Sequence, residues 1–236
     1  MSVRRIAGFL GATVVAVGAA LLGAAVPSTS AEPCPDVEVV FARGTGEPPG
    51  VGGVGQAFVD SVRAQSGGRS VDVYAVNYPA SSDFADRLAF AGTVVDGIRD
   101  AGAHVQSMAA NCPSTRMVLG GYSQGAVVAG FVTAAVVPAG VPAEYASSLP
   151  KPMPPEVADH VAAVALIGTP SEAFLREQGA PPIVVGPRYA AKTIELCAPG
   201  DTICDGTPGG GPTIAHALYA MNGMVDEAAA FAASRT

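Results

Sequence analysis

The chain has 236 residues, of which 49% are hydrophobic and 14% are charged, with 29 glycines and 20 prolines. This length and apolar content suit one globular domain with a single core, and they exclude a disordered or fibrous chain and two domains of ordinary size. The 13 basic and 20 acidic residues give a formal net charge of −7, which argues against a nucleic-acid partner.

The N-terminal segment differs from the rest of the chain in composition. Arg4 and Arg5 precede a long uncharged run rich in Gly and Ala, and small residues follow this run up to Ala31. This order is typical of a secretory signal peptide, so residues 1–31 are interpreted as a cleaved leader and 32–236 as the single domain of an exported protein. The uncharged run is also long enough for a membrane-spanning helix, which is the alternative interpretation.

Beyond the leader, short apolar runs alternate with longer stretches that have helical spacing of apolar residues. Continuous apolar runs are typical of strands buried on both faces of a parallel sheet. The alternation predicts a doubly wound, three-layer α/β sandwich with a central, mostly parallel sheet. The expected strands are 37–41, 71–76, 117–122, 161–168 and 193–197, and the expected helices are 55–65, 83–110, 124–137 and 213–233.

The segment 138–155 contains six prolines and few apolar residues in register. We interpret it as a surface excursion that is too short for a separate cap, so we expect no large lid. In doubly wound sheets the reactive groups gather in loops beyond the carboxyl ends of the strands. This rule gives a positional test for each candidate site residue.

All four cysteines lie beyond the leader, and an even number in an exported chain predicts two disulfides. Cys34 and Cys112 each stand just before an expected strand, so both fall at the same edge of a parallel sheet. We therefore expect the pairs Cys34–Cys112 and Cys197–Cys204. No histidine or second cysteine pair stands at ligand spacing, which argues against a metal site.

A candidate nucleophile lies between the third expected strand and the helix after it. Residues 121–125 have the sequence GYSQG and fit G-x-S-x-G, in which the serine occupies a tight strand-to-helix turn. The pattern alone is weak in a chain with 29 glycines, and a glycine-rich turn with an idle serine is the alternative. The strand before the motif and the helix after it favour Ser123 as the nucleophile.

A serine hydroxyl needs a base within hydrogen-bond reach, usually a histidine oriented by a carboxylate. His104 lies within an expected helix and His160 leads into a strand at the far edge of the sheet, so both are expected to be structural or exposed to solvent. His216 lies past the last strand, where the chain order serine, acid, histidine requires the base. A capping or surface role for His216 is the alternative.

Eight acidic residues lie between Ser123 and His216, and position favours Asp201. Asp201 follows the last strand in a turn that the expected Cys197–Cys204 bridge would hold rigid, as an orienting carboxylate requires. The alternative is that Pro-Gly-Asp is simply a turn. Asp205, just outside the bridge, is the reserve candidate.

An oxyanion formed on the substrate needs backbone N–H donors, one of them from the residue after the nucleophile. That residue is Gln124. A second donor is expected from Thr45, in a glycine-rich turn directly after the first strand. Such a turn is also found in phosphate-binding loops, but the G-x-x-x-x-G-K-[ST] pattern is absent from the sequence.

With these pieces assembled, the chain resembles the cutinase family, in particular the secreted cutinase-like esterases of mycobacteria and related actinobacteria. The matching pieces extend over nearly all of the chain beyond the leader. They are the segments 41–45, 77–80 and 120–125 and the pattern Cys197-x-x-x-Asp201-x-x-Cys204 followed by His216.

The resemblance implies an α/β-hydrolase-type sandwich without a large lid and a triad of Ser123, Asp201 and His216. It also implies an oxyanion hole from Thr45 and Gln124, the same two disulfides and no cofactor. One departure is the loop 209–212, Gly-Gly-Gly-Pro, where the family has a shorter and more apolar approach to the histidine. We expect this loop to be mobile and to border the acyl pocket together with 181–185.

The predicted function is that of a secreted serine esterase acting on short- to medium-chain acyl esters, with lipids or cutin as further candidate substrates. An acyltransferase on the same scaffold and a catalytically inactive lipid-binding or interaction protein are the alternatives. The expected partners are an ester or lipid substrate and a transient lipid interface, with no nucleic acid, for a monomer that is free outside the cell or associated with the cell wall.

Overall fold

The computed structural model describes residues 34–139, 141 and 149–236. The chain divides into two units, Met1–Pro33 and Cys34–Thr236, of which the second is described here. The expected leader, and the part of the proline-rich excursion at 140 and 142–148, lie outside the described residues. Within the described ranges, the helices are all too short or too polar to cross a membrane.

A five-stranded sheet lies at the centre of the domain, with strand order β2-β1-β3-β4-β5 and every neighbouring pair parallel. The three central strands are almost completely buried, because helices cover both faces. The predicted parallel sheet is therefore confirmed. The strands are β1 (Val37–Ala42), β2 (Val71–Ala75), β3 (Arg116–Tyr122), β4 (Val161–Ile167) and β5 (Thr193–Leu196).

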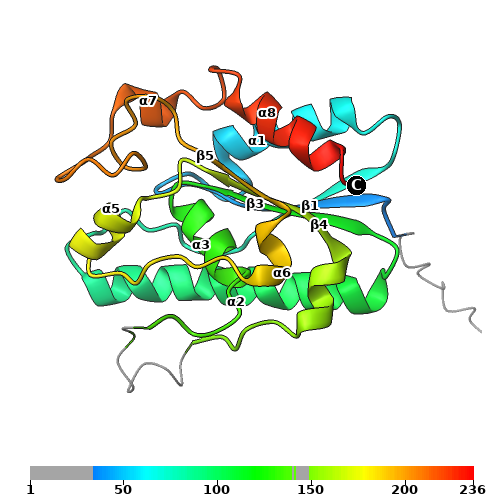
Figure 1. Cartoon of the computed structure of the whole chain (residues 1–236), viewed down its shortest axis with the longest axis horizontal. Helices are drawn as coiled ribbons and strands as arrows, with labels where there is room; N and C mark the ends of the chain where they lie inside the picture. The colour runs from blue at the N-terminus through cyan, green and yellow to red at the C-terminus, as the bar shows by residue number, and fades with distance from the viewer. Residues whose placement is uncertain (1–33, 140, 142–148) are drawn as a thin grey trace, which may run out of the picture. The chain divides into compact units, whose positions relative to one another are not determined.

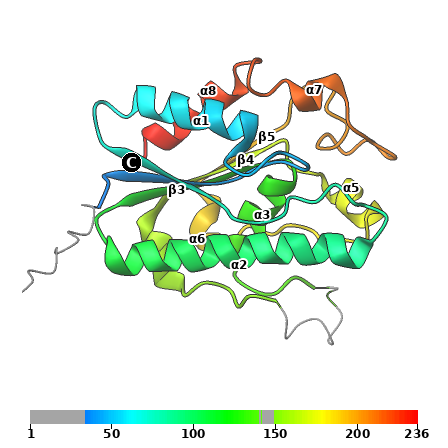
Figure 2. The same ribbon diagram turned by 180° about the vertical axis from the view of Figure 1, so that it is seen from behind.

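Helices form a layer on each face of the sheet (Figure 1). One layer consists of α1 (Gly52–Gln65) and α8 (Met224–Ala233), which pack against each other. The other layer contains α2 (Arg87–Asn111) and α3 (Gln124–Val132), and Figure 2 shows α2 running along almost the whole length of the domain. The short elements are η1 (Pro155–His160), α5 (Glu172–Glu177), α6 (Pro187–Ala190) and α7 (Ile214–Ala217).

The helix ends differ from the sequence prediction where side chains or glycine stop the helix. The helix expected from 83 begins at Arg87, because the Asp86 carboxylate caps it by accepting the Ala89 N–H at 3.0 Å. The helix expected over 213–233 is two helices, α7 and α8. They are separated at Gly223, whose φ of 85° is incompatible with a continuous helix.

The helix expected over 124–137 also ends early, at Val132. The Thr133 hydroxyl donates to the Gly130 carbonyl at 2.6 Å, and the Thr133 carbonyl accepts the Gly186 N–H at 3.1 Å. These bonds replace the next helical turn and connect the end of α3 to the segment before α6.

The disulfide Cys34–Cys112, at the amino edge of the sheet, joins the chain just before β1 to the residue just after α2. Its two Cα atoms are 5.6 Å apart, and the bridge closes a loop with a sequence separation of 78. By restricting the unfolded chain, a loop of this size adds about 4 kcal/mol to the free energy of unfolding.

Candidate active site

The turn at Ser123 is a sharp strand-to-helix elbow. Ser123 lies between the end of β3 and the start of α3 with φ of 54° and ψ of −118°, a strained backbone conformation for a residue with a side chain. A Cβ atom at Gly121 would overlap the backbone of Gly125, and one at Gly125 would overlap the carbonyl of Ala42 on β1. Both glycines of the motif are therefore required by close backbone approach.

Ser123, His216 and Asp201 form a continuous hydrogen-bonded chain. The distance from Ser123 Oγ to His216 Nε2 is 2.8 Å, and the distance from His216 Nδ1 to Asp201 Oδ2 is also 2.8 Å. An ionised carboxylate only accepts hydrogen bonds, so Nδ1 carries the proton and Nε2 accepts the serine hydroxyl. Ser123 and His216 are each 8% exposed and Asp201 is fully buried.

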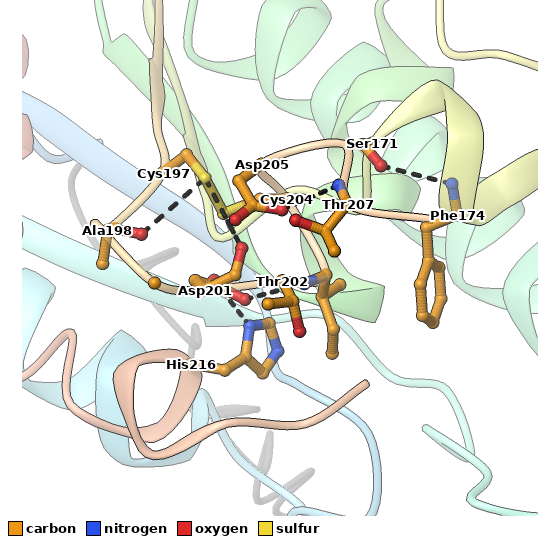
Figure 3. The surroundings of a disulfide bond; sticks show 12 residues. Ser171, Phe174, Cys197, Ala198, Asp201, Thr202, Cys204, Asp205, Thr207 and His216 are labelled. Atoms are coloured by element: carbon orange, nitrogen blue, oxygen red, sulfur yellow. Dashed lines mark hydrogen bonds and ion pairs between the residues drawn. A yellow bond between two sulfur atoms is a disulfide. The ribbon is translucent and has the colours of Figure 1, made fainter. Parts of the chain in front are cut away.

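The loop that carries Asp201 follows β5 and is closed by the disulfide Cys197–Cys204, as the sequence predicted. Figure 3 shows the carboxylate of Asp201 between this bridge and the ring of His216. The Asp201 N–H donates to the Ala198 carbonyl at 3.0 Å, and Oδ1 accepts the Ile203 N–H at 3.1 Å. These short-range bonds fix the orientation of the carboxylate relative to the bridge.

The reserve candidate Asp205 occupies a different environment. It is exposed, and its carboxylate accepts the N–H of Thr207 at 2.9 Å (Figure 3). This hydrogen bond holds the pKa of Asp205 below its ordinary value. The structure therefore brings Asp201, and not Asp205, to His216.

Hydrogen bonds to its backbone N–H and to its carbonyl fix His216 within the short helix α7. The side chain of Thr213 caps the helix by accepting the His216 N–H, and it also donates to the Gly200 carbonyl at 2.9 Å. On the other side, the hydroxyl of Tyr122 donates to the His216 carbonyl, and the two rings are 5.2 Å apart. Burial raises the pKa of Tyr122 to about 12, so this phenol keeps its proton at neutral pH.

The loop 209–212, which was expected to be mobile, has specific contacts with the Asp201 loop. The hydroxyl of Thr202 donates to the Gly211 carbonyl at 2.8 Å and accepts the Gly211 N–H at 3.1 Å. The Gly209 N–H donates to the carboxylate of Glu177 at 3.2 Å. This approach to His216 is therefore connected both to the triad loop and to α5.

Thr45 and Gln124, the expected oxyanion donors, line the same hollow as Ser123 and His216. Gln124 is the first residue of α3, so its N–H has no intrahelical acceptor and is available to a ligand. The Gln124 side chain donates to the Ser81 carbonyl at 3.2 Å, and Gly46 N–H donates to the Ala80 carbonyl at 2.7 Å. The turn that carries Thr45 and the start of α3 are thus both bonded to residues 80–81, which lie between β2 and α2.

A buried arginine, Arg43, supports the turn that carries Thr45. Arg43 is 4% exposed, and its guanidinium donates to the carbonyls of Glu47, Val76 and Tyr78. The Tyr78 hydroxyl donates back to the Arg43 carbonyl. This network fixes the turn after β1 against the segment after β2.

The carboxylate of Glu47 also stabilises the turn that carries Thr45. It accepts the Gly44 N–H at 2.6 Å and the Gly53 N–H at 2.7 Å, so it joins the Thr45 turn to the start of α1. The sequence analysis assigned no role to Arg43, Glu47 or Tyr122. Only their positions in the sequence could have indicated these roles. Arg43 and Glu47 lie on either side of Thr45 in the segment after β1, and Tyr122 directly precedes the nucleophile.

The other two histidines have structural contacts. His104 Nε2 lies 3.0 Å from the carboxylate of Glu38, and its ring stacks on Tyr74 with 3.5 Å between centroids. The Nδ1 atom of His160 lies 3.0 Å from the Pro113 carbonyl. Neither histidine belongs to the hydrogen-bonded chain at Ser123, in agreement with the sequence analysis.

An apolar groove of about 1680 Å³ opens at Ser123 and His216, and its lining comes from α2, α3, α5 and residues 149–154. Its walls include Leu88 and Val95 of α2, Val127 and Phe131 of α3, and Phe174 of α5. Residues 210–212 and Pro181, from the two segments expected to border an acyl pocket, also line this groove. In contrast, Pro182 and Ile183 line a separate hollow of about 360 Å³ beside Glu195.

Across 34–139, 141 and 149–236, His, Cys, Asp and Glu side chains form no group of three that could hold a metal ion.

The profile of the cutinase family matches residues 33–236. The chain belongs to the cutinase family. This match covers every element of the sheet and every residue of the Ser–His–Asp chain, so the cutinase family resemblance noted in the sequence is confirmed.

Two relatives in this family come from Mycobacterium tuberculosis. The protein named probable carboxylesterase Culp7 is 61% identical over 172 residues, which is 73% of this chain and 88% of the relative. The protein named phospholipase Culp4 is 46% identical over 232 residues, which is 98% of this chain and 92% of the relative.

A solved structure has the same cutinase fold. The cutinase of Trichoderma reesei, in complex with a phosphonate inhibitor, is 33% identical in sequence and superposes with a TM-score of 0.61. The match covers 86% of this chain and 77% of the Trichoderma chain. The α/β-hydrolase sandwich expected from the sequence is thereby confirmed.

Proposed function

We propose that this protein is a serine esterase that hydrolyses carboxylic esters through an acyl-enzyme on Ser123. The observation that carries the proposal is the buried chain from Asp201 through His216 to Ser123, with both distances at 2.8 Å. A serine on a strained elbow, in contact with an oriented imidazole, is the arrangement that nucleophilic acyl transfer requires.

In the first half-reaction, Ser123 Oγ attacks the ester carbonyl carbon while His216 Nε2 takes the serine proton. The C=O electrons move onto the oxygen, and the N–H groups of Thr45 and Gln124 stabilise this charge. When the tetrahedral intermediate collapses, the ester C–O bond breaks and His216 donates its proton to the leaving alcohol. The acyl group is then bound to Ser123 as an ester.

In the second half-reaction, His216 takes a proton from a water molecule, whose oxygen attacks the acyl carbon. Collapse of the second intermediate releases the carboxylic acid and returns the proton to Ser123. In both steps the imidazole becomes positively charged beside Asp201. Because Asp201 is fully buried, its negative charge stabilises this cation with little screening by solvent.

The substrate class follows from the shape and polarity of the groove. Apolar side chains of α2 and α3 line it, so it suits the acyl chain of an ester whose carbonyl lies at Ser123. The names carboxylesterase and phospholipase of the two relatives agree with ester substrates. We propose short- to medium-chain acyl esters as the first substrates, followed by lipid esters and cutin.

A transient contact with a lipid interface belongs to this proposal. Phe84 and Leu88 are 49% and 67% exposed at the groove, and Ile214, two residues before His216, is 79% exposed. Exposed apolar side chains at the entrance to a site favour contact with an emulsified substrate. The two disulfides and the leader-like sequence of residues 1–31 support export from the cell. A monomeric state is part of the proposal.

Hydrolysis of a p-nitrophenyl ester series from acetate to palmitate, by the chain without residues 1–31, tests the proposal. We expect turnover that Ser123→Ala abolishes while folding, followed by circular dichroism, stays the same. The dependence of kcat/KM on acyl length then ranks the substrates. An added alcohol acceptor with product analysis separates hydrolysis from acyl transfer.

Two outcomes would contradict the proposal. Equal turnover in Ser123→Ala would exclude Ser123 as the nucleophile. A folded wild-type chain that neither hydrolyses any ester of the series nor reacts with a fluorophosphonate probe would instead favour a binding protein.

A further inference from the structure

Tyr219 is a buried tyrosine whose hydroxyl contacts the carboxylate of the triad. It lies two residues after α7, is fully buried, and donates to Asp201 Oδ2 at 2.7 Å. The oxygen that it contacts is the same one that accepts the Nδ1–H of His216 at 2.8 Å. Two donors therefore share one carboxylate oxygen.

The orientation of the Tyr219 hydroxyl is determined by its second hydrogen bond. The Ala198 N–H donates to the Tyr219 oxygen at 2.8 Å, so the single hydroxyl proton remains for Asp201. The ring packs against Gly168, where a Cβ atom would lie 2.9 Å from Tyr219 Cε2. Packing thus fixes the ring, and backbone hydrogen bonding fixes the direction of its hydroxyl.

The phenol keeps its proton over the working range of an esterase. Burial raises the pKa of Tyr219 well above the ordinary value of 10, and the Asp201 carboxylate beside it also raises it. The group is therefore a permanent donor to the carboxylate. The Asp201 carboxylate has three hydrogen-bond partners, which are His216, Tyr219 and the Ile203 N–H.

A donor on Oδ2 affects the basicity of the site. The Tyr219 hydroxyl takes a share of the negative charge on the oxygen that faces His216 Nδ1, and it keeps the carboxylate from rotating. Without this donor, the oxygen that faces His216 Nδ1 would carry more negative charge and would attract the imidazolium more strongly. This change moves the acid limb of the activity profile to higher pH.

We infer that Tyr219 is a positioning residue of this esterase, which orients the Asp201 carboxylate and limits the charge that it presents to His216. The inference rests on the proposed function and adds a fourth residue to the Ser–His–Asp chain. Tyr219 acts through Asp201 and does not itself contact the reacting atoms.

The experiment compares the pH dependence of ester hydrolysis in two variants of opposite effect. In Tyr219→Phe the donor is lost, so we expect kcat to fall about tenfold with KM within twofold, and the acid limb of kcat/KM to move to higher pH. Replacement of Tyr219 by 3-fluorotyrosine makes the phenol a stronger donor at nearly the same size. We expect this variant to move the acid limb to lower pH.

Tyr189→Phe is the matched control, because Tyr189 is 7% exposed and packs in the core on the other face of the sheet. We expect its pH profile to equal that of the wild type. Thermal unfolding of every variant separates folding from chemistry. If Tyr219→Phe lowers only the unfolding temperature, with kcat and the acid limb unchanged, Tyr219 is a core residue and the inference is wrong.

A readout without substrate separates this inference from the proposed function. The ¹H resonance of the His216 Nδ1 proton reports its hydrogen bond to Asp201, and we expect it to shift in Tyr219→Phe. A wild-type chain without esterase activity would overturn the proposed function, whereas an unchanged Nδ1 resonance in Tyr219→Phe would overturn the role of Tyr219.

Discussion

The two edges of the sheet each carry one disulfide, and the two bridges differ in what they constrain. At the amino edge, Cys34–Cys112 spans 78 residues and lies before β1 and β3. At the carboxyl edge, Cys197–Cys204 spans only seven residues and encloses Asp201. A long loop restricts the unfolded chain strongly, whereas a short one restricts it weakly but fixes local geometry. Stability and catalysis therefore depend on opposite edges of the same sheet.

The largest effect is expected at the carboxyl edge, from Asp201→Asn. The amide retains the shape of the side chain but removes the charge and favours the wrong imidazole tautomer, so we expect kcat to fall about 10⁴-fold with folding unchanged. Steady-state hydrolysis of a p-nitrophenyl ester measures this loss. Asp205→Asn is the control, and an equal loss in that variant would contradict the assignment of Asp201.

Removal of the long bridge, by Cys34→Ala with Cys112→Ala, is expected to have the next largest effect. We expect the free energy of unfolding to fall by about 4 kcal/mol while kcat of the folded enzyme stays the same, because the bridge lies at the edge away from Ser123. Urea denaturation followed by circular dichroism measures the stability. A large loss of kcat at 25 °C in the folded double variant would break the proposed division between the edges.

Arg43→Lys tests the support of the oxyanion turn at the carboxyl edge. An ammonium group cannot reach the three carbonyls that the guanidinium of Arg43 joins, so we expect kcat to fall about 10²-fold with little change in KM. Arg69→Lys is the matched control, because Arg69 also donates to two backbone carbonyls but belongs to the chain between α1 and β2. Equal kinetics in the two variants would show that Arg43 has no special role in the turn.

Removal of the short bridge, by Cys197→Ala with Cys204→Ala, is expected to have the smallest effect. We expect a loss of about 2 kcal/mol in the free energy of unfolding, since the closed loop is short. We also expect about a tenfold lower kcat, because Asp201 loses part of its local support. Kinetics and urea denaturation on the same samples give both numbers. A loss confined to stability would mean that the hydrogen bonds to Asp201 suffice to orient it.

Local patterns in the sequence were sufficient for the sheet and for the Ser–His–Asp chain. The buried strands are continuous apolar runs, and the elbow glycines must precede and follow Ser123 at fixed spacing, so both features could be predicted from neighbouring residues. The chain order of serine, acid and histidine then limited the choice of His216 and Asp201.

The supporting residues could not be predicted in this way, because they act between segments that are distant in sequence. Arg43 donates to the carbonyls of Val76 and Tyr78, and Tyr122 contacts the backbone of a residue 94 positions away. Apolar periodicity does not encode such contacts. The end of α3 at Val132 was missed for the same reason. The Gly186 N–H, 53 residues after Thr133, donates to the Thr133 carbonyl and replaces the hydrogen bond that the next helical turn would provide.

The close approach of Gly125 to the Ala42 carbonyl has a consequence for engineering. A library that randomises the pocket gains nothing from positions 121 and 125, since a side chain at 121 would push α3 away from β3 and one at 125 would push α3 away from β1 before either could alter selectivity. Variation is better directed to the groove positions on α2, such as Leu88 and Val95, which line the groove and lie outside the G-x-S-x-G motif. Acyl preference can then be changed while the nucleophile keeps its geometry.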